Sequence, residues 1–132
     1  MKKDIAGRKD IELLVSEFYK KVQQDPTIGY IFSDIAKVNW EKHLPVMYDF
    51  FENMLFYTGS YTGNPMQLHK NLNRVVPLTS VHFDQWYYLF STTVDELFEG
   101  ETASLAKQRA QSIATVMQLK IRDEHSLPGK GL

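Results

Sequence analysis

Residues 61–69 read YTGNPMQLH, and this stretch leads from a loop into a short helix. Asn64 is a suitable cap for the helix, and Pro65 suits the first helical position, where its missing N–H would have had no helical partner. Leu68 and His69 then lie inside the helix. Because its neighbours are polar, His69 on its own would be interpreted as a surface residue, so its role depends on what the rest of the chain places around it.

Outside this stretch, apolar residues recur at spacings of three and four, which is typical of amphipathic helices. No segment shows a convincing alternation with a period of two, so the sequence predicts an all-α protein. Four segments carry the helical pattern, approximately at residues 11–22, 40–55, 83–98 and 103–121. With the short helix around His69, they form a single domain spanning residues 1–132, in which 1–9 and 123–132 are expected to be flexible tails.

Local signals suggest where the helices begin and end. Asp10 is the expected cap of the first helix, and Asp25 ends it because a proline follows. Asn39 is the expected cap of the second helix, in which Pro45 should bend the axis or delay the start. Gly100 ends the helix that covers residues 83–98.

Composition excludes several classes of function. The 132 residues carry a formal net charge of −1, so there is no basic surplus to bind nucleic acid or an anionic membrane. The absence of cysteine rules out disulfides, thiolate ligands to haem and cysteine-based zinc sites. The N-terminus lacks the apolar core of a signal peptide, and no apolar run approaches the ~20 residues of a membrane helix. We therefore expect a cytoplasmic protein.

Three polar side chains lie on stripes that are otherwise apolar: Tyr19, His43 and Trp86. A polar tip that faces an interior is costly without a partner, and a few such tips in an apolar setting suit a ligand pocket. Each also has a simpler interpretation. An inward histidine is more often a satisfied core residue, a buried tyrosine usually bonds a backbone carbonyl, and a tryptophan on a helical stripe is usually core.

The whole set of residues resembles a truncated haemoglobin of the third group. The resemblance extends roughly from Ile11 to Ile121, and this sequence shares with that group the absence of a Gly-Gly pair. The stretches that carry it are 18–19 (FY), 28–32 (IGYIF), 40–47 (WEKHLPVM), 61–69 (YTGNPMQLH), 83–86 (FDQW), 98–101 (FEGE) and 107–117 (KQRAQSIATVM). Phe50-Phe51 departs from the family, which often has Phe-Trp there.

The resemblance implies a globin-like, two-over-two helical sandwich around a b-type haem. His69 would be the proximal ligand of the iron, and Phe32 would pack against the porphyrin. Tyr19, His43 and Trp86 would lie on the distal side. Lys70 and Arg74 are candidate contacts for the haem propionates, although a solvated surface is the favoured interpretation of these two residues.

These residues suggest a haem protein that binds O₂ and other diatomic ligands with high affinity. A hydroxyl or indole N–H directed at a charged ligand atom contributes about 1.5–3 kcal/mol, which slows ligand escape roughly ten- to hundredfold. Tyr19 is the expected main donor, assisted by Trp86. His43 is a gate, a second polar contact or an iron ligand in the ligand-free state.

Tight binding argues against bulk O₂ delivery and favours redox chemistry, either conversion of nitric oxide to nitrate or cleavage of a peroxide. Both require an electron donor. The chain has no Gly-rich dinucleotide motif, so a separate reductase is expected. One alternative is a non-enzymatic helical interaction module without haem, in which Tyr19, His43 and Trp86 satisfy one another. A bare metal held by His43 and His69 is a further alternative, although two histidines alone make a poor site.

Overall fold

The chain is described by a computed structural model covering residues 2–59, 61 and 63–126, with side chains as far as Arg122. No strand occurs in this part of the chain, which confirms the all-α prediction. The elements are α1 (Arg8–Gln24), a π-helical turn η1 (Ile31–Ile35), α2 (Trp40–Phe56), α3 (Pro65–Val75), α4 (Ser80–Leu97) and α5 (Glu101–Ser126).

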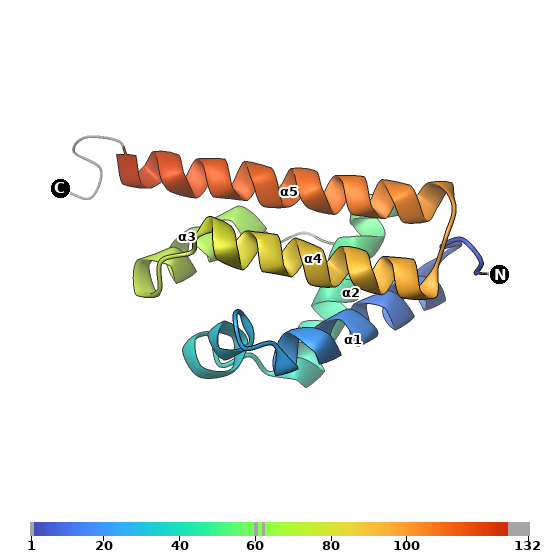
Figure 1. Cartoon of the computed structure of the whole chain (residues 1–132), viewed down its shortest axis with the longest axis horizontal. Helices are drawn as coiled ribbons and strands as arrows, with labels where there is room; N and C mark the ends of the chain where they lie inside the picture. Colours follow the sequence, from blue (N-terminus) through green and yellow to red (C-terminus); the bar gives the residue numbers. More distant parts are fainter. Residues whose placement is uncertain (1, 60, 62, 127–132) are drawn as a thin grey trace.

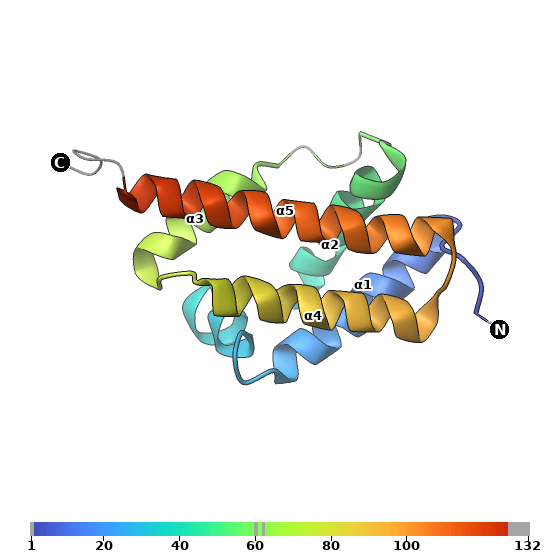
Figure 2. The same cartoon turned by 45° about the horizontal axis from the view of Figure 1, so that its top comes forward.

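The helices form two layers of two. α4 and α5 run antiparallel and side by side in both views (Figure 1, Figure 2). α1 packs against α2, and this second pair lies on the first through contacts of α1 with α4 and of α2 with α5. α3 packs against α5 near one end of the sandwich, so the short helix with His69 closes that end.

The two layers meet in an aromatic core. Phe18 of α1, Phe51 of α2 and Phe90 of α4 are almost completely buried. The rings of Phe51 and Phe90 stack with their centroids 5.2 Å apart, and Phe18 meets Phe90 edge to face at 5.3 Å. These are favoured geometries for aromatic pairs. The α5 residues buried in this core are small, which lets the helix approach its neighbours: Ala103, Ala106 and Ala110.

Side-chain caps define the starts of α2 and α3. The side chain of Asn39 accepts a hydrogen bond from the Glu41 N–H at 3.1 Å, and that of Asn64 accepts one from the Gln67 N–H at 3.0 Å. Both helices therefore begin where the sequence predicts. Pro45 does not delay α2, because the helix is already formed from Trp40 onward.

The beginning of the chain differs from the prediction of a flexible tail at residues 1–9. Ile5 is only 3% exposed and belongs to the core. The Asp4 carboxylate accepts hydrogen bonds from the N–H groups of Thr102 and Ala103 at 2.9 and 2.8 Å, so it caps α5 from 98 residues away. Residues 2–9 are thus held in place by contacts with the core and with the start of α5. The prediction of a flexible tail is wrong for these residues.

Asp10 is not the cap of α1, as the sequence suggested. The helix already begins at Arg8, and the Asp10 carboxylate folds back to accept a hydrogen bond from the Ala6 N–H at 2.8 Å. It also pairs with the Lys3 ammonium at 2.9 Å. At the other end, residues 123–126 continue α5 instead of forming a tail, and residues 127–132 lie outside the described residues.

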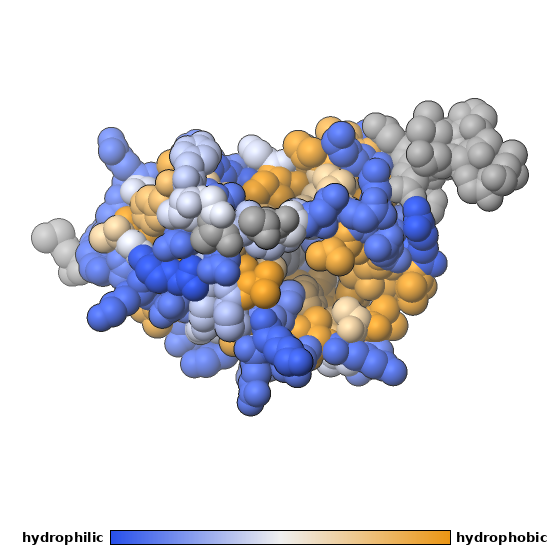
Figure 3. Space-filling model, turned by 180° about the vertical axis from the view of Figure 1, so that it is seen from behind, coloured by the Kyte–Doolittle hydropathy of each residue, from blue (hydrophilic) through white to orange (hydrophobic). Residues whose placement is uncertain are grey.

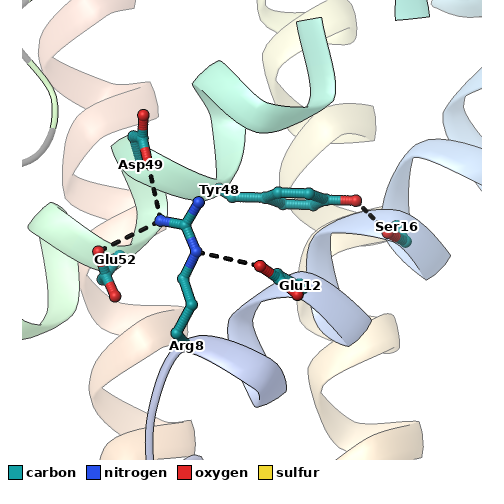
Figure 4. Close-up of polar contacts among 6 residues, drawn as sticks. All are labelled: Arg8, Glu12, Ser16, Tyr48, Asp49 and Glu52. Carbon is teal, nitrogen blue, oxygen red and sulfur yellow. Dashed lines mark hydrogen bonds and ion pairs between the residues drawn. The ribbon is translucent and has the colours of Figure 1, made fainter. Parts of the chain in front are cut away.

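A polar cluster links α1 to α2 on the outer face of the sandwich (Figure 4). The Arg8 guanidinium donates to Asp49 at 2.7 Å, to Glu52 at 3.2 Å and to Glu12 at 3.2 Å. Nearby, the hydroxyl groups of Ser16 and Tyr48 are 2.7 Å apart. Exposed ion pairs contribute little individually, but one guanidinium shared by three carboxylates favours a single placement of α2 against α1.

Candidate functional site

A cavity of 310 Å³ lies between the two layers. Its walls are mainly apolar and come from α1, η1, α2, α3, α4 and α5. Figure 3 shows apolar surface, in orange, around a hollow on the face opposite to that of Figure 1. All five side chains that the sequence singles out line this cavity: Tyr19, Phe32, His43, His69 and Trp86. The fold thus brings together residues from five separate elements.

His69 stands on α3 with its ring orientation set by the backbone. Its Nδ1 lies 2.6 Å from the carbonyl oxygen of Pro65, one helical turn earlier. A carbonyl oxygen only accepts hydrogen bonds, so Nδ1 must carry the proton, and in the neutral ring the lone pair is then on Nε2. Burial lowers the pKa of His69, although the bond to Pro65 opposes this shift. The ring is therefore neutral at pH 7 and can ligate a metal through Nε2.

Tyr19 forms the centre of a polar and aromatic group on the α1–α2 side of the cavity. Its side chain is 4% exposed, and burial raises the pKa of its hydroxyl. The neighbouring Trp86 side chain opposes this rise in the pKa. An indole only donates, so toward Trp86 the Tyr19 oxygen can act only as an acceptor and keeps its own proton available for another group.

His43 contributes an unsatisfied polar atom to the same side. Its ring lies edge to face with Tyr19, with the centroids 5.7 Å apart, and its Nε2 is buried with no hydrogen-bond partner in the described part of the chain. Burial also lowers the pKa of His43, so the ring is neutral at pH 7. An unpaired buried nitrogen costs about 1–3 kcal/mol, which a polar ligand inside the cavity would offset.

Phe32 closes the cavity beside these residues. It comes from η1, where the chain turns between α1 and α2. Its ring stacks on Trp40 at 5.9 Å with an interplanar angle of 26°, and it meets Tyr19 edge to face at 5.9 Å. Phe32 therefore presents a fixed apolar ring to the cavity.

Sequence reasoning missed two polar residues that also line the cavity, Tyr61 and His82. The Tyr61 ring packs edge to face on Phe50, with the centroids 5.2 Å apart, and burial raises the pKa of its hydroxyl. His82 occupies the third position of α4. The one available signal for His82 was its place three residues after Thr79, where a capping box has Glu or Gln. Neither Lys70 nor Arg74, the candidates for propionate contacts, is among the lining residues.

The two alternative interpretations find little support. A helical module with a self-satisfied core would have Tyr19, His43 and Trp86 fully paired, whereas the His43 Nε2 has no partner in the described residues and a large apolar cavity adjoins it. A bare metal site needs more ligands than two histidines. No group of three His, Asp or Glu side chains suited to a metal ion occurs in the part of the chain that the structure describes.

A two-over-two helical sandwich around an apolar cavity lined by histidines is the architecture of the globin class of proteins. Comparisons with known proteins agree. The family model described as bacterial-like globin matches residues 3–122. The chain belongs to this family.

The relatives are truncated haemoglobins. Over 121 residues the chain is 30% identical to a group 3 truncated haemoglobin of Campylobacter jejuni, covering 89% of this chain and 93% of the relative. It is 33% identical over 94 residues to a group 1 truncated haemoglobin of Chlamydomonas moewusii, covering 70% of this chain and 52% of that protein. The crystal structure of the group III truncated haemoglobin from C. jejuni superposes with a TM-score of 0.82 at 29% identity, covering 92% of this chain and 95% of that one. The resemblance to the third group is confirmed.

Membership of the globin family implies haem as the cofactor and binding of diatomic ligands. The cavity fits such a group. It offers large apolar walls for a macrocycle, one neutral imidazole with its lone pair on Nε2, and a second histidine whose buried nitrogen has no partner among the described residues. None of the described helices is both long enough and apolar enough to cross a membrane.

Proposed function

We propose that this protein holds b-type haem through His69 and binds O₂ and other diatomic ligands with high affinity. The observation that carries the proposal is the convergence of His69, Tyr19, His43, Trp86 and Phe32 on one apolar cavity. The haem supplies an iron atom that binds the ligand and exchanges electrons with it. The protein supplies the proximal imidazole, hydrogen-bond donors and a space that excludes water.

The chain has no cysteine with which to form the thioether links of a c-type haem, in agreement with the b-type haem that the resemblance implies. Attachment then depends on the His69 bond and on burial of the porphyrin faces against apolar side chains such as Phe32. The Pro65 carbonyl, by accepting from Nδ1, orients the imidazole and raises its electron donation to the metal.

Tyr19 is the main donor to the bound ligand. The neighbouring Trp86 indole can only donate, so toward Trp86 the Tyr19 oxygen can act only as an acceptor and its own proton remains for the ligand. A hydrogen bond to a partly charged atom contributes about 1.5–3 kcal/mol. Ligand dissociation is therefore slowed by roughly ten- to hundredfold, a range suited to a reaction on the ligand and poorly suited to its delivery.

For the reaction itself, nitric oxide dioxygenation fits better than peroxide cleavage. One NO, one O₂ and one electron combine to give one nitrate ion, and no proton has to be transferred. Cleavage of a peroxide O–O bond needs an acid to protonate the leaving oxygen. His43, whose pKa is lowered by burial, would first have to take up a proton from the peroxide before it could pass one to the leaving oxygen.

The electron must come from a separate protein, because the sequence has no Gly-rich motif for a dinucleotide cofactor. The donor is a one-electron reductase that docks where the cavity opens. A cytoplasmic location, in which reduced nicotinamide cofactors supply such reductases, is consistent with this requirement.

The experiment is a single turnover. The haem-loaded protein is reduced, exposed to O₂ and mixed with one equivalent of NO. We expect one nitrate per protein and a change of the absorption spectrum to the ferric form within milliseconds. Formation of nitrite in place of nitrate, or persistence of free NO, would contradict the proposed reaction without affecting the assignment of the haem site.

A further inference from the structure

His82 has a proton position that is determined by the start of its helix. Its Nδ1 accepts a hydrogen bond from the Thr79 backbone N–H at 3.0 Å, one half of the reciprocal arrangement called a capping box. An N–H only donates, so Nδ1 carries the lone pair. The proton of the neutral ring is therefore on Nε2, the reverse of the tautomer found at His69.

The Nε2–H of His82 has no hydrogen-bond acceptor among the described residues. His82 is half-buried and lines the cavity next to Leu78 and Phe83. In the described part of the chain its Nε2 makes no hydrogen bond, whereas its Nδ1 is engaged by Thr79. A donor is thus presented at an otherwise apolar part of the cavity wall.

The connection that leads into α4, the helix of His82, is fixed by a hydrogen bond. The side chain of Asn73, 5% exposed, accepts a hydrogen bond from the Leu78 N–H at 2.7 Å. This bond ties the segment between α3 and α4 back onto α3, at the left end of the molecule in Figure 2. His82 is consequently positioned before any ligand arrives, and little side-chain entropy is lost when its donor is used.

Haem brings two carboxylates, its propionates, which require donors where the macrocycle meets solvent. Among the polar side chains of the cavity, Tyr19, His43 and Trp86 form one cluster, Tyr61 packs on Phe50, and His69 is the proposed iron ligand. His82 lies outside these groups and offers an N–H with no partner in the described residues.

We propose that His82 binds one haem propionate through Nε2–H and that Thr79, by holding Nδ1, keeps the ring in the donating tautomer. This inference rests on the proposed haem site. It adds a carboxylate-binding residue to that site and replaces Lys70 and Arg74, which do not line the cavity.

The test compares His82→Gln with His82→Glu. Both side chains can accept from the Thr79 N–H, so both preserve the helix start, but Gln presents an N–H₂ to the propionate and Glu presents a negative charge. The rate of hemin loss is measured by transfer to excess apomyoglobin. It is measured with normal hemin and with hemin dimethyl ester, whose propionates carry no charge.

With normal hemin, we expect the Gln variant to lose haem at close to the wild-type rate and the Glu variant to lose it about tenfold faster. With the dimethyl ester, the difference between the variants should disappear. Because the two hemins are compared within each variant, any change in protein stability cancels. His82→Phe provides a second comparison, in which the faster loss should again be confined to normal hemin.

An equal rate for the Glu and Gln variants, or a difference of the same size with the ester, overturns the proposal. Either result leaves the haem site intact, because the wild type still binds both hemins. Failure of the wild type to bind hemin at all overturns the propionate contact together with the proposed function, and an absorption spectrum distinguishes that case at once.

Discussion

The Nδ1 atom of His69 lies 2.6 Å from the carbonyl oxygen of Pro65, one helical turn before it on α3. Pro65 thereby has two roles. Its ring suits the first position of the helix, and its carbonyl keeps the His69 imidazole in the tautomer that leaves Nε2 free for a metal. The short α3 helix therefore orients the one ligand that the iron is proposed to take from the protein.

Replacing this ligand should weaken haem binding strongly. We expect His69→Ala to lose the intense absorption band of normally ligated haem and to release hemin much faster than the wild type. The smaller His69→Gly variant should regain the band when imidazole is added to the buffer, because free imidazole can occupy the vacated space. A normal spectrum for His69→Ala would show that another residue binds the iron.

Removing the Tyr19 hydroxyl should accelerate O₂ dissociation. In Tyr19→Phe we expect the rate, measured by stopped flow, to rise roughly ten- to hundredfold, because the ligand loses its charge-assisted hydrogen bond. Carbon monoxide carries less negative charge, so its dissociation should change much less. An O₂ dissociation rate equal to that of the wild type would reduce Tyr19 to a packing residue.

Loss of the N-terminal cap of α5 should destabilise the fold. Desolvation by burial raises the pKa of the Asp4 carboxyl, but hydrogen bonds from the N–H groups of Thr102, Ala103 and Ile5 lower this pKa overall. The charged form of Asp4 is therefore favoured in the folded protein. We expect Asp4→Ala to lower the free energy of unfolding by about 1 kcal/mol in urea titrations at pH 7. Asp4→Asn keeps an acceptor and should cost less.

The same carboxylate has a defined dependence on pH. The contribution of the charged Asp4 to the free energy of unfolding is present above the unfolded-state pKa of 3.8. It is lost as the pH falls through the lower folded-state pKa. The gap in stability between the wild type and Asp4→Ala should therefore narrow in strongly acidic solution. A gap that stays constant down to pH 2 would mean that the charge of Asp4 is irrelevant.

His43 should make the protein less stable in mild acid. Burial lowers its pKa below the unfolded-state value of 6.5, so the unfolded chain takes up a proton first as the pH falls. Stability is then lost below pH 6.5, by at most about 1.4 kcal/mol per pH unit, until the folded-state pKa is reached. Thermal unfolding of the haem-loaded protein between pH 7.5 and 5.5 measures this effect.

The matched variant for this prediction is His43→Gln, which has no titrating group at that position. Its midpoint of unfolding should fall less than that of the wild type over the same range, because His69 and the acidic residues contribute equally to both proteins. Parallel curves for the two proteins would indicate that His43 titrates at its ordinary value.

Features with a local cause were predictable. The apolar stripe through Phe18 needs only the helical period, and the caps at Asn39 and Asn64 bond to N–H groups two or three residues away. The inward direction of Tyr19 and His43 follows from the same period. These predictions are confirmed because each depends on interactions within one or two turns of a helix.

Features with a distant cause were not predictable. Nothing near Asp4 or Ile5 indicates that these residues are held by the beginning of α5 and by the core, since the partners are almost a hundred residues away. The position of His82 beside the cavity also depends on how α3, α4 and their connection fold together. A short apolar or polar stretch without a period carries no sign of such contacts.

The sequence by itself determined the helices, the caps of α2 and α3 and, through the resemblance to truncated haemoglobins, the family and the residues to examine. Only the tertiary structure decided that side chains from five elements meet at one cavity, that Pro65 fixes the tautomer of His69, and that the His43 nitrogen stays unpaired. The physical reason is that hydrogen bonding within a helix acts over a few residues, whereas the cavity is created by the packing of two layers whose members are far apart in the chain.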